Sequence, residues 1–279
     1  MFHICSTRMP ALTLSTDIGQ SDYLVGAIKG QLVSAVPNCN IADITHQLSP
    51  YNYQQAAYVC KSAFKYFPAG TFHIIIINFF EKAPNHLLLA EYNQQYIICP
   101  DNGILTMITG TKPSKIFGIN TQQNGRYTLL DCTAVMASAI QKLVSGEQPG
   151  NITTPVNAIE EKYPMRSAIG PDWIDSQIIY IDNFENVVVN LTKEEFEEIR
   201  KNRKFKIVLM RNSEFITKIS DHYASAHPGE NLAFFNSAGY LEIAINKGNV
   251  AGLFGLQKYA NTSNMQNRLL YQTVRITFE

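Results

Sequence analysis

Two carboxylates lie five residues apart near the start of the chain, on either side of a glycine. Asp17 follows an alternating apolar run at residues 12–15, and Asp22 precedes apolar residues at helical spacing over residues 23–35. This pattern predicts a strand, a turn at Gly19 and a helix. Asp17 would then lie at the carboxyl end of a strand, the edge where open α/β sheets bind ligands. A simpler interpretation makes Asp17 a turn residue and Asp22 the N-cap of the helix.

A histidine further along is a candidate acid–base group. His46 lies three residues after Asp43, and histidine is the side chain most often used for proton transfer. The sequence pairs no nucleophile with it, so we expect a structural role for His46 at the end of a strand.

The first half of the chain alternates strand and helix signals. A continuous apolar run at residues 72–77 is typical of a strand buried on both faces. The alternation predicts an α/β domain, with a mainly parallel sheet between helices. We expect strands at 12–15, 40–44, 72–77, 87–92 and 95–99, and helices at 23–35, 53–67, 104–108 and 131–144.

The second half has a different pattern. Residues 146–171 are rich in Pro, Gly, Asn and Thr, which is typical of a domain boundary. Turn-separated strands then predict a small antiparallel β-barrel or sandwich. We therefore expect an α/β domain at 1–160, a linker at 161–175 and a β-barrel domain at 176–279. The predicted strands are 177–181, 187–191, 205–210, 233–235, 241–245 and 270–277, with one helix at 193–201.

Composition excludes several classes of function. Of 279 residues, 46% are hydrophobic and 16% charged, which is enough apolar surface for a large core. The 23 basic and 23 acidic residues cancel, so no net field favours nucleic acid or an anionic membrane. Five scattered cysteines without a Cys-x-x-Cys pair argue against a disulfide framework or a zinc site. With no signal-peptide pattern and no apolar run long enough for a bilayer, we expect a cytoplasmic protein.

Seven blocks, in one order across both halves, resemble the S-adenosylmethionine (SAM) hydroxide adenosyltransferases, relatives of the fluorinating and chlorinating enzymes. Seven ordered blocks are far more specific than one motif. They are TDIGQSD at 16–22, VGAIKG at 25–30, ADITH at 42–46, FPAGT at 67–71, PDNGILT at 100–106, YIDNFEN at 180–186 and NSAGYLEIA at 236–244.

The resemblance implies a fluorinating-enzyme-like two-domain fold and a homotrimer. Substrate would lie between the α/β domain of one subunit and the barrel of its neighbour. The family reaction is attack at the ribose 5′ carbon of SAM, which with water as nucleophile gives adenosine and L-methionine. No metal and no redox cofactor takes part.

The resemblance also assigns binding roles within the first domain and at the first turn of the second. Asp17 falls on the position that binds the ribose hydroxyls, a task suited to a carboxylate. Tyr51 replaces an aromatic residue that packs on the ribose. Asp22 and Asp182 fall near the methionine ammonium.

Two further positions belong to the second domain. Asn186 falls on the position that reads the adenine edge with one donor and one acceptor, and Ser237 on one that binds the methionine carboxylate. Simpler interpretations stay open: Asp182 and Asn186 shape a turn, Ser237 belongs to a hairpin turn, and Tyr51 packs at a helix start.

The chain departs from the family at the water-activating positions. The hydrolytic branch places an Asp, an Arg and a His around the attacking water, and here Asn78, Asn85 and Thr128 stand in their places. Asn and Thr cannot take a proton near neutral pH, and lost acid–base assistance commonly costs about 10²–10⁴-fold in rate. His86 or Glu81 could substitute if the loop folds back.

The chlorinating and fluorinating patterns are not met either. Leu129 replaces the small residue expected beside a halide, and Ala238 and Ile245 stand where the halogenating relatives use arginines.

Three functions follow from these observations. The first is an enzyme that hydrolyses SAM with a displaced catalytic group. The second is a catalytically inactive nucleoside or SAM binder. The third is an enzyme of the same scaffold that acts on another adenosine compound. The fold cannot choose among them, because function depends on the site.

Overall fold

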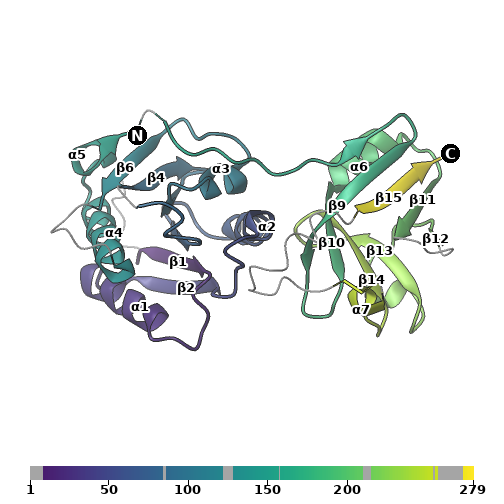
Figure 1. Cartoon of the computed structure of the whole chain (residues 1–279), viewed down its shortest axis with the longest axis horizontal. Helices are drawn as coiled ribbons and strands as arrows, with labels where there is room; N and C mark the ends of the chain where they lie inside the picture. The colour runs from purple at the N-terminus through teal and green to yellow at the C-terminus, as the bar shows by residue number, and fades with distance from the viewer. Residues whose placement is uncertain are drawn as a thin grey trace. The chain divides into compact units, whose positions relative to one another are not determined.

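The computed structural model describes residues 9–83, 86–121, 128–156, 158–209, 215–253, 255–256 and 273–279. The chain divides into two compact units, Met1–Pro164 and Met165–Glu279, which are the purple-to-teal and the green-to-yellow parts of Figure 1.

The first unit is built on a mixed seven-stranded sheet with the order β2-β1-β3-β5-β4-β6-β7. The first four strands in this order are parallel, and the last three continue the sheet antiparallel. Every residue of β3 is buried, as expected for a central strand covered on both faces. The strands are β1 (Ala11–Thr16), β2 (Asn40–Thr45), β3 (Phe72–Ile76), β4 (His86–Tyr92), β5 (Gln95–Pro100), β6 (Ile116–Asn120) and β7 (Thr154–Pro155).

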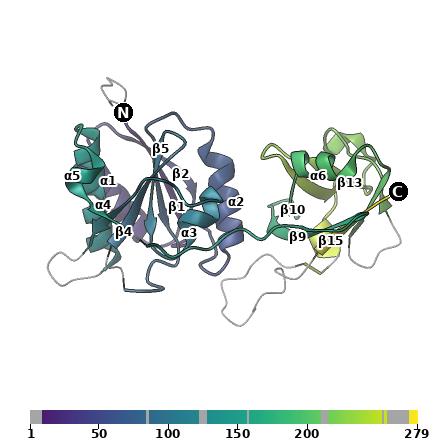
Figure 2. The ribbon, with the colours of Figure 1, turned by 90° about the horizontal axis from the view of Figure 1, so that it is seen from above.

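Helices cover both faces of this sheet, as the view from above shows (Figure 2). One layer packs Ile28 and Leu32 of α1 with Met136 and Ile140 of α4 against the sheet. The other layer packs α2 and α3 against the opposite sheet face. Burying each such aliphatic side chain stabilises the fold by roughly 1.5–3 kcal/mol. The helices are α1 (Leu24–Ala35), α2 (Tyr53–Phe64), α3 (Ile104–Thr109), α4 (Leu129–Val144) and α5 (Pro149–Ile152).

The second unit is a nearly closed antiparallel barrel. Its strand order is β12-β11-β15-β9-β10-β14-β13, and β8 pairs with β9. A bridge between Ile219 and Ala233 of β13 brings the two ends of this order together. The strands are β8 (Ala168–Ile169), β9 (Trp173–Ile181), β10 (Val187–Thr192), β11 (Phe205–Leu209), β12 (Phe215–Ile216), β13 (Asn231–Phe235), β14 (Tyr240–Ile245) and β15 (Thr273–Phe278), with α6 (Lys193–Arg200), α7 (Val250–Leu253) and the 3-10 turn Tyr223–Ser225.

The predicted fold class is confirmed: an α/β domain is followed by an antiparallel barrel. The helix predicted at 53–67 is too long, because α2 ends at Phe64. Tyr66 and Phe67 donate their backbone N–H groups to the carbonyls of Ala63 and Phe64, so the chain tightens into turns. The strand β6 was not predicted, since Gly118 interrupts its apolar pattern. Met210 and residues 270–272, predicted as strand, lie outside the described residues.

Within the described part of the chain, no helix is long and apolar enough to cross a membrane.

Candidate functional site

The carboxyl ends of β1 and β3 bring Asp17 and Asn78 together. The two strands are parallel neighbours, with Thr16 opposite Ile76, and β2 and β5 lie on opposite sides of this pair. This is the topological switch point where ligands bind in such sheets. The Asn78 backbone N–H donates to Asp17 Oδ2 at 2.7 Å, and Asn78 adopts φ +43°. Asn102, after β5, donates through Nδ2 to the carbonyls of Ile77 and Asn78 at 2.9 and 3.2 Å.

Burial dominates the electrostatics of Asp17. Loss of water around the half-buried carboxylate raises its pKa, and the hydrogen bond from the Asn78 N–H lowers it less strongly. An acceptor fixed in this way can receive hydrogen bonds from ligand hydroxyl groups.

A phenol and an ion pair extend the site beyond Asn78. Asn78 Nδ2 donates to the Tyr53 hydroxyl at 3.3 Å, and that hydroxyl donates to Glu81 Oε2 at 2.7 Å. Lys162 Nζ lies 3.3 Å from Glu81 and 4.5 Å from the centroid of the Tyr53 ring. Burial, followed by the Glu81 carboxylate, raises the pKa of Tyr53. The sequence patterns suggested neither Tyr53 nor Lys162, because both side chains act through contacts with distant segments.

The segments that hold this cluster are fixed locally. Asn52 caps α2 by accepting from the Gln55 N–H, which sets Tyr53 at the first turn of the helix. The Glu81 N–H donates to the Asn78 carbonyl at 3.1 Å, so the chain turns back after β3. The Lys162 N–H donates to Thr106 Oγ1 at 2.9 Å, which ties residue 162 to α3.

Two other predicted ligand contacts of this unit lie at the surface. Asp22 is exposed, and its interpretation as a helix cap is wrong: the N-cap of α1 is Tyr23, without a side-chain cap bond. Tyr51 is 58% exposed. A side chain this open is accessible to a ligand, so the predicted binding roles of both residues stay predictions.

His46 has the structural setting expected for it. The side chain is buried, with Nδ1 3.0 Å from Thr16 Oγ1 and Nε2 3.2 Å from Asp43 Oδ1. Its backbone carbonyl accepts from the Gly19 N–H at 2.7 Å. His46 therefore braces the turn that carries Asp17, and Gly19 takes φ +83°, which an L side chain rarely adopts.

Thr128 and His86, two residues considered above for water activation, have structural partners. Thr128 caps α4 in a capping box, in which its hydroxyl accepts from the Asp131 N–H and the Asp131 carboxylate accepts from the Thr128 N–H. His86 Nε2 lies 3.2 Å from Asp101 Oδ2. Asn85 lies outside the described residues.

In the second unit, Asp182 and Asn186 form one tight turn between β9 and β10. Asp182 Oδ1 accepts from the N–H groups of Phe184 and Asn186, both at 2.8 Å. Asp182 Oδ2 accepts from Asn186 Nδ2 at 3.0 Å. Both side chains thus shape the turn, as the simpler interpretation expected, and their predicted contacts with a ligand stay predictions.

A buried glutamate joins this turn to the 236–239 hairpin. Glu242 is 5% exposed and accepts from the Tyr223 hydroxyl at 2.6 Å and from Asn236 Nδ2 at 3.1 Å. The Tyr223 hydroxyl also lies 3.4 Å from Asn186 Nδ2. Ser237 is exposed at the tip of this hairpin. The signal for Glu242 in the sequence is a single charged residue within the apolar run of β14.

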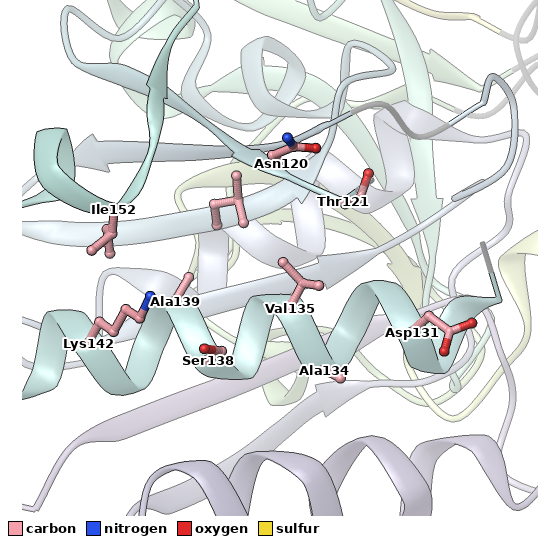
Figure 3. A pocket seen from close by; sticks show the side chains of 10 residues that line it. Asn120, Thr121, Asp131, Ala134, Val135, Ser138, Ala139, Lys142 and Ile152 are labelled. Atoms are coloured by element: carbon pink, nitrogen blue, oxygen red, sulfur yellow. The ribbon is translucent and has the colours of Figure 1, made fainter. Parts of the chain in front are cut away.

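A hollow of about 360 Å³ lies on the α4 side of the first unit, between α4 and β6. Figure 3 shows side chains from these two elements around it, together with Ile152 of α5. None of the predicted binding residues lines it, so it is separate from the Asp17 cluster.

The comparisons with known proteins agree with this architecture. A family model described as the SAM hydroxide adenosyltransferase N-terminal domain matches residues 12–153, and the C-terminal domain model of that family matches residues 176–262. The chain belongs to the SAM hydroxide adenosyltransferase family.

Named relatives and a solved structure extend the match. An (R)-S-adenosyl-L-methionine hydrolase of Methanocaldococcus jannaschii is 25% identical over 84% of this chain and 87% of its own. The hydrolase of Thermus thermophilus is 24% identical over 87% and 94%. A fluorinase of an Actinoplanes species matches only 22% of the chain, at 29% identity. The fold matches that of an uncharacterized conserved protein from Thermotoga maritima, with TM-score 0.79 and 21% identity over 96% of this chain and 99% of that one.

Proposed function

We propose that this protein binds SAM and hydrolyses it at the ribose 5′ carbon to adenosine and L-methionine. The observation that carries the proposal is the Asp17 carboxylate, half-buried at the switch point of the sheet and fixed by the Asn78 N–H at 2.7 Å, in a chain of this family. Relatives that match most of the chain carry the name of this activity.

In this proposal Asp17 binds the ribose hydroxyls and Tyr51 packs on the ribose ring. Asp22 offsets the positive charge of the methionine ammonium. Tyr51 and Asp22 are exposed, so a ligand can reach them without displacing buried side chains.

The barrel supplies the remaining contacts in the proposal. Asn186 reads the adenine edge, Ser237 binds the methionine carboxylate, and Asp182 adds negative charge near the ammonium. These come from the neighbouring subunit of a homotrimer, as the family resemblance implies. No metal or redox cofactor is needed, because the positive sulfur of SAM lets methionine leave as a neutral thioether.

A second candidate function is a SAM or adenosine binder without catalysis. It is favoured by Asn78 and Thr128, whose side chains are engaged with Tyr53 and in the α4 capping box. Neither group accepts a proton from water near neutral pH.

Calorimetric titration with SAM and with adenosine, combined with chromatography of the products, separates the two. Binding heat with release of adenosine and methionine supports hydrolysis. Binding heat without products supports the binder. No heat with either compound overturns both functions, and D17N serves as the variant that should weaken the heat while the protein stays folded.

A further inference from the structure

Tyr53 connects two groups that differ in their ability to hold a proton. Its hydroxyl accepts from Asn78 Nδ2 at 3.3 Å and donates to Glu81 Oε2 at 2.7 Å. An amide nitrogen cannot take a proton near neutral pH, whereas a carboxylate can. Of these two partners, Glu81 is the one that can accept the proton of the phenol.

Glu81 is held in place by an ion pair with Lys162. Lys162 Nζ lies 3.3 Å from both of its carboxylate oxygens, and the same ammonium lies over the Tyr53 ring. Glu81 is partly open to solvent, with 35% of its side chain exposed. A proton delivered to it can pass on to water outside the site.

The phenol is also tied to the proposed ribose ligand. The Asn78 backbone N–H donates to Asp17, and its side-chain amide donates to the Tyr53 hydroxyl. Asn78 therefore fixes the position of the carboxylate relative to the phenol. Burial raises the pKa of Tyr53, so its hydroxyl stays protonated. Such a group can accept a second proton only if it gives up its own at the same time.

Hydrolysis of a sulfonium releases one proton, which such a path can carry away. The water oxygen forms a bond to the 5′ carbon, the bond from that carbon to sulfur breaks, and methionine leaves as a neutral thioether. The attacking water must lose one proton, and a positioned acid–base group commonly contributes about 10²–10⁴-fold to such a step.

We propose that Tyr53 contacts the attacking water and accepts its proton while passing its own proton to Glu81. This inference rests on the proposed function, since it names the group that serves that reaction. Glu81 acts through Tyr53 and is the terminal acceptor, and Lys162 positions it.

The test uses Y53F and E81Q in the full-length protein. A matched control exists in the same unit: the Tyr163 hydroxyl donates to Glu161 at 2.5 Å at an exposed site, so Y163F and E161Q remove an equivalent pair. For each variant, kcat, KM, the calorimetric Kd for SAM and the solvent deuterium isotope effect on kcat are measured.

We expect Y53F and E81Q to lower kcat by about 100-fold or more, with the Kd for SAM unchanged and the isotope effect altered. Y163F and E161Q should match the wild type. Wild-type kcat in Y53F, or a loss of SAM binding in step with kcat, overturns the inference. A wild type that binds SAM without turnover also overturns it and leaves the binding function, whereas no binding of SAM by the wild type overturns the proposed function itself.

Discussion

At the scale of single residues, Asp17 links sequence to proposed function most directly. Its place at the end of β1 follows from the alternating pattern of residues 12–15, and its partner Asn78 follows from the pairing of β1 with β3. Partial burial raises the pKa of the carboxyl group. The folded state therefore binds a proton at Asp17 more readily than the unfolded chain does.

This raised pKa predicts a pH dependence of SAM binding. In the proposed complex the ionised carboxylate accepts hydrogen bonds from the ribose hydroxyls. Affinity should therefore fall as the pH drops through the raised pKa of Asp17, at a higher pH than for an ordinary aspartate. The contribution of Asp17 to stability has the opposite sign: it is present below its ordinary pKa and is lost as pH rises.

D17N should weaken SAM binding by about 10–150-fold, the equivalent of about 1.5–3 kcal/mol for hydrogen bonds to a charged group. It should also flatten the pH profile of Kd measured by calorimetry. D175N is the control, since Asp175 accepts from Arg275 at an exposed site of the second unit. Equal pH profiles for D17N and the wild type would contradict the role of Asp17.

At the scale of elements, the start of α4 decides how Thr128 is interpreted. Its hydroxyl and backbone serve the capping box with Asp131, which accounts for the residue without any catalytic role.

T128A should lower the free energy of unfolding by about 1 kcal/mol, the usual cost of losing an N-cap, and leave kcat unchanged. T128S keeps the cap and should restore stability. Denaturant unfolding and the SAM assay give the two readouts. A loss of turnover in T128A at wild-type stability would show that Thr128 acts in catalysis.

A second prediction concerns His73, which lies in strand β3. The ring stacks on Phe64 at 3.7 Å and is fully buried, and burial lowers the pKa of His73 to about 4 from 6.5. The charged form is therefore disfavoured in the folded state. Stability from this residue is present above about pH 6.5 and is lost as pH falls towards about 4.

As the pH falls from about 7.5 to about 5, the titration of His73 should lower the free energy of unfolding of the wild type by about 2 kcal/mol. H73F removes the titrating group and should show a smaller loss over the same range in urea unfolding. An identical loss in both proteins would mean that His73 does not titrate as its burial requires.

The sequence predicted elements better than contacts. Alternation placed β1, a continuous apolar run placed β3 and helical spacing placed α4, because local hydrophobic patterns reflect burial directly. Tyr53, Lys162 and Glu242 were missed, since each owes its setting to segments far away in sequence. The end of α2 at Phe64 was placed too late for a local reason. Apolar residues continue to Phe67, although the chain leaves the helix for tighter turns after Phe64.

At the scale of the whole molecule, the chain joins an α/β unit to a nearly closed barrel, and the proposed contacts are divided between them. Asp17 belongs to the first unit and Asn186 to the second. The proposed homotrimer would complete each site with residues from two subunits, as closed cyclic assemblies allow.

Subunit mixing tests this arrangement. D17N and N186A should each be weak, and equal mixtures that exchange subunits should regain up to about a quarter of wild-type turnover, because a quarter of the interfaces then combine two intact halves. The double variant D17N/N186A mixed with itself is the control. Exchange verified by mass, without any recovery, would place the whole site within one subunit.

Attack of water on the 5′ carbon of SAM can be followed by running the reaction in ¹⁸O-labelled water. The predicted result is equimolar adenosine and methionine, with the label in the 5′-hydroxyl group of adenosine as read by mass spectrometry. Unlabelled adenosine, or the absence of both products at saturating SAM, would contradict the account.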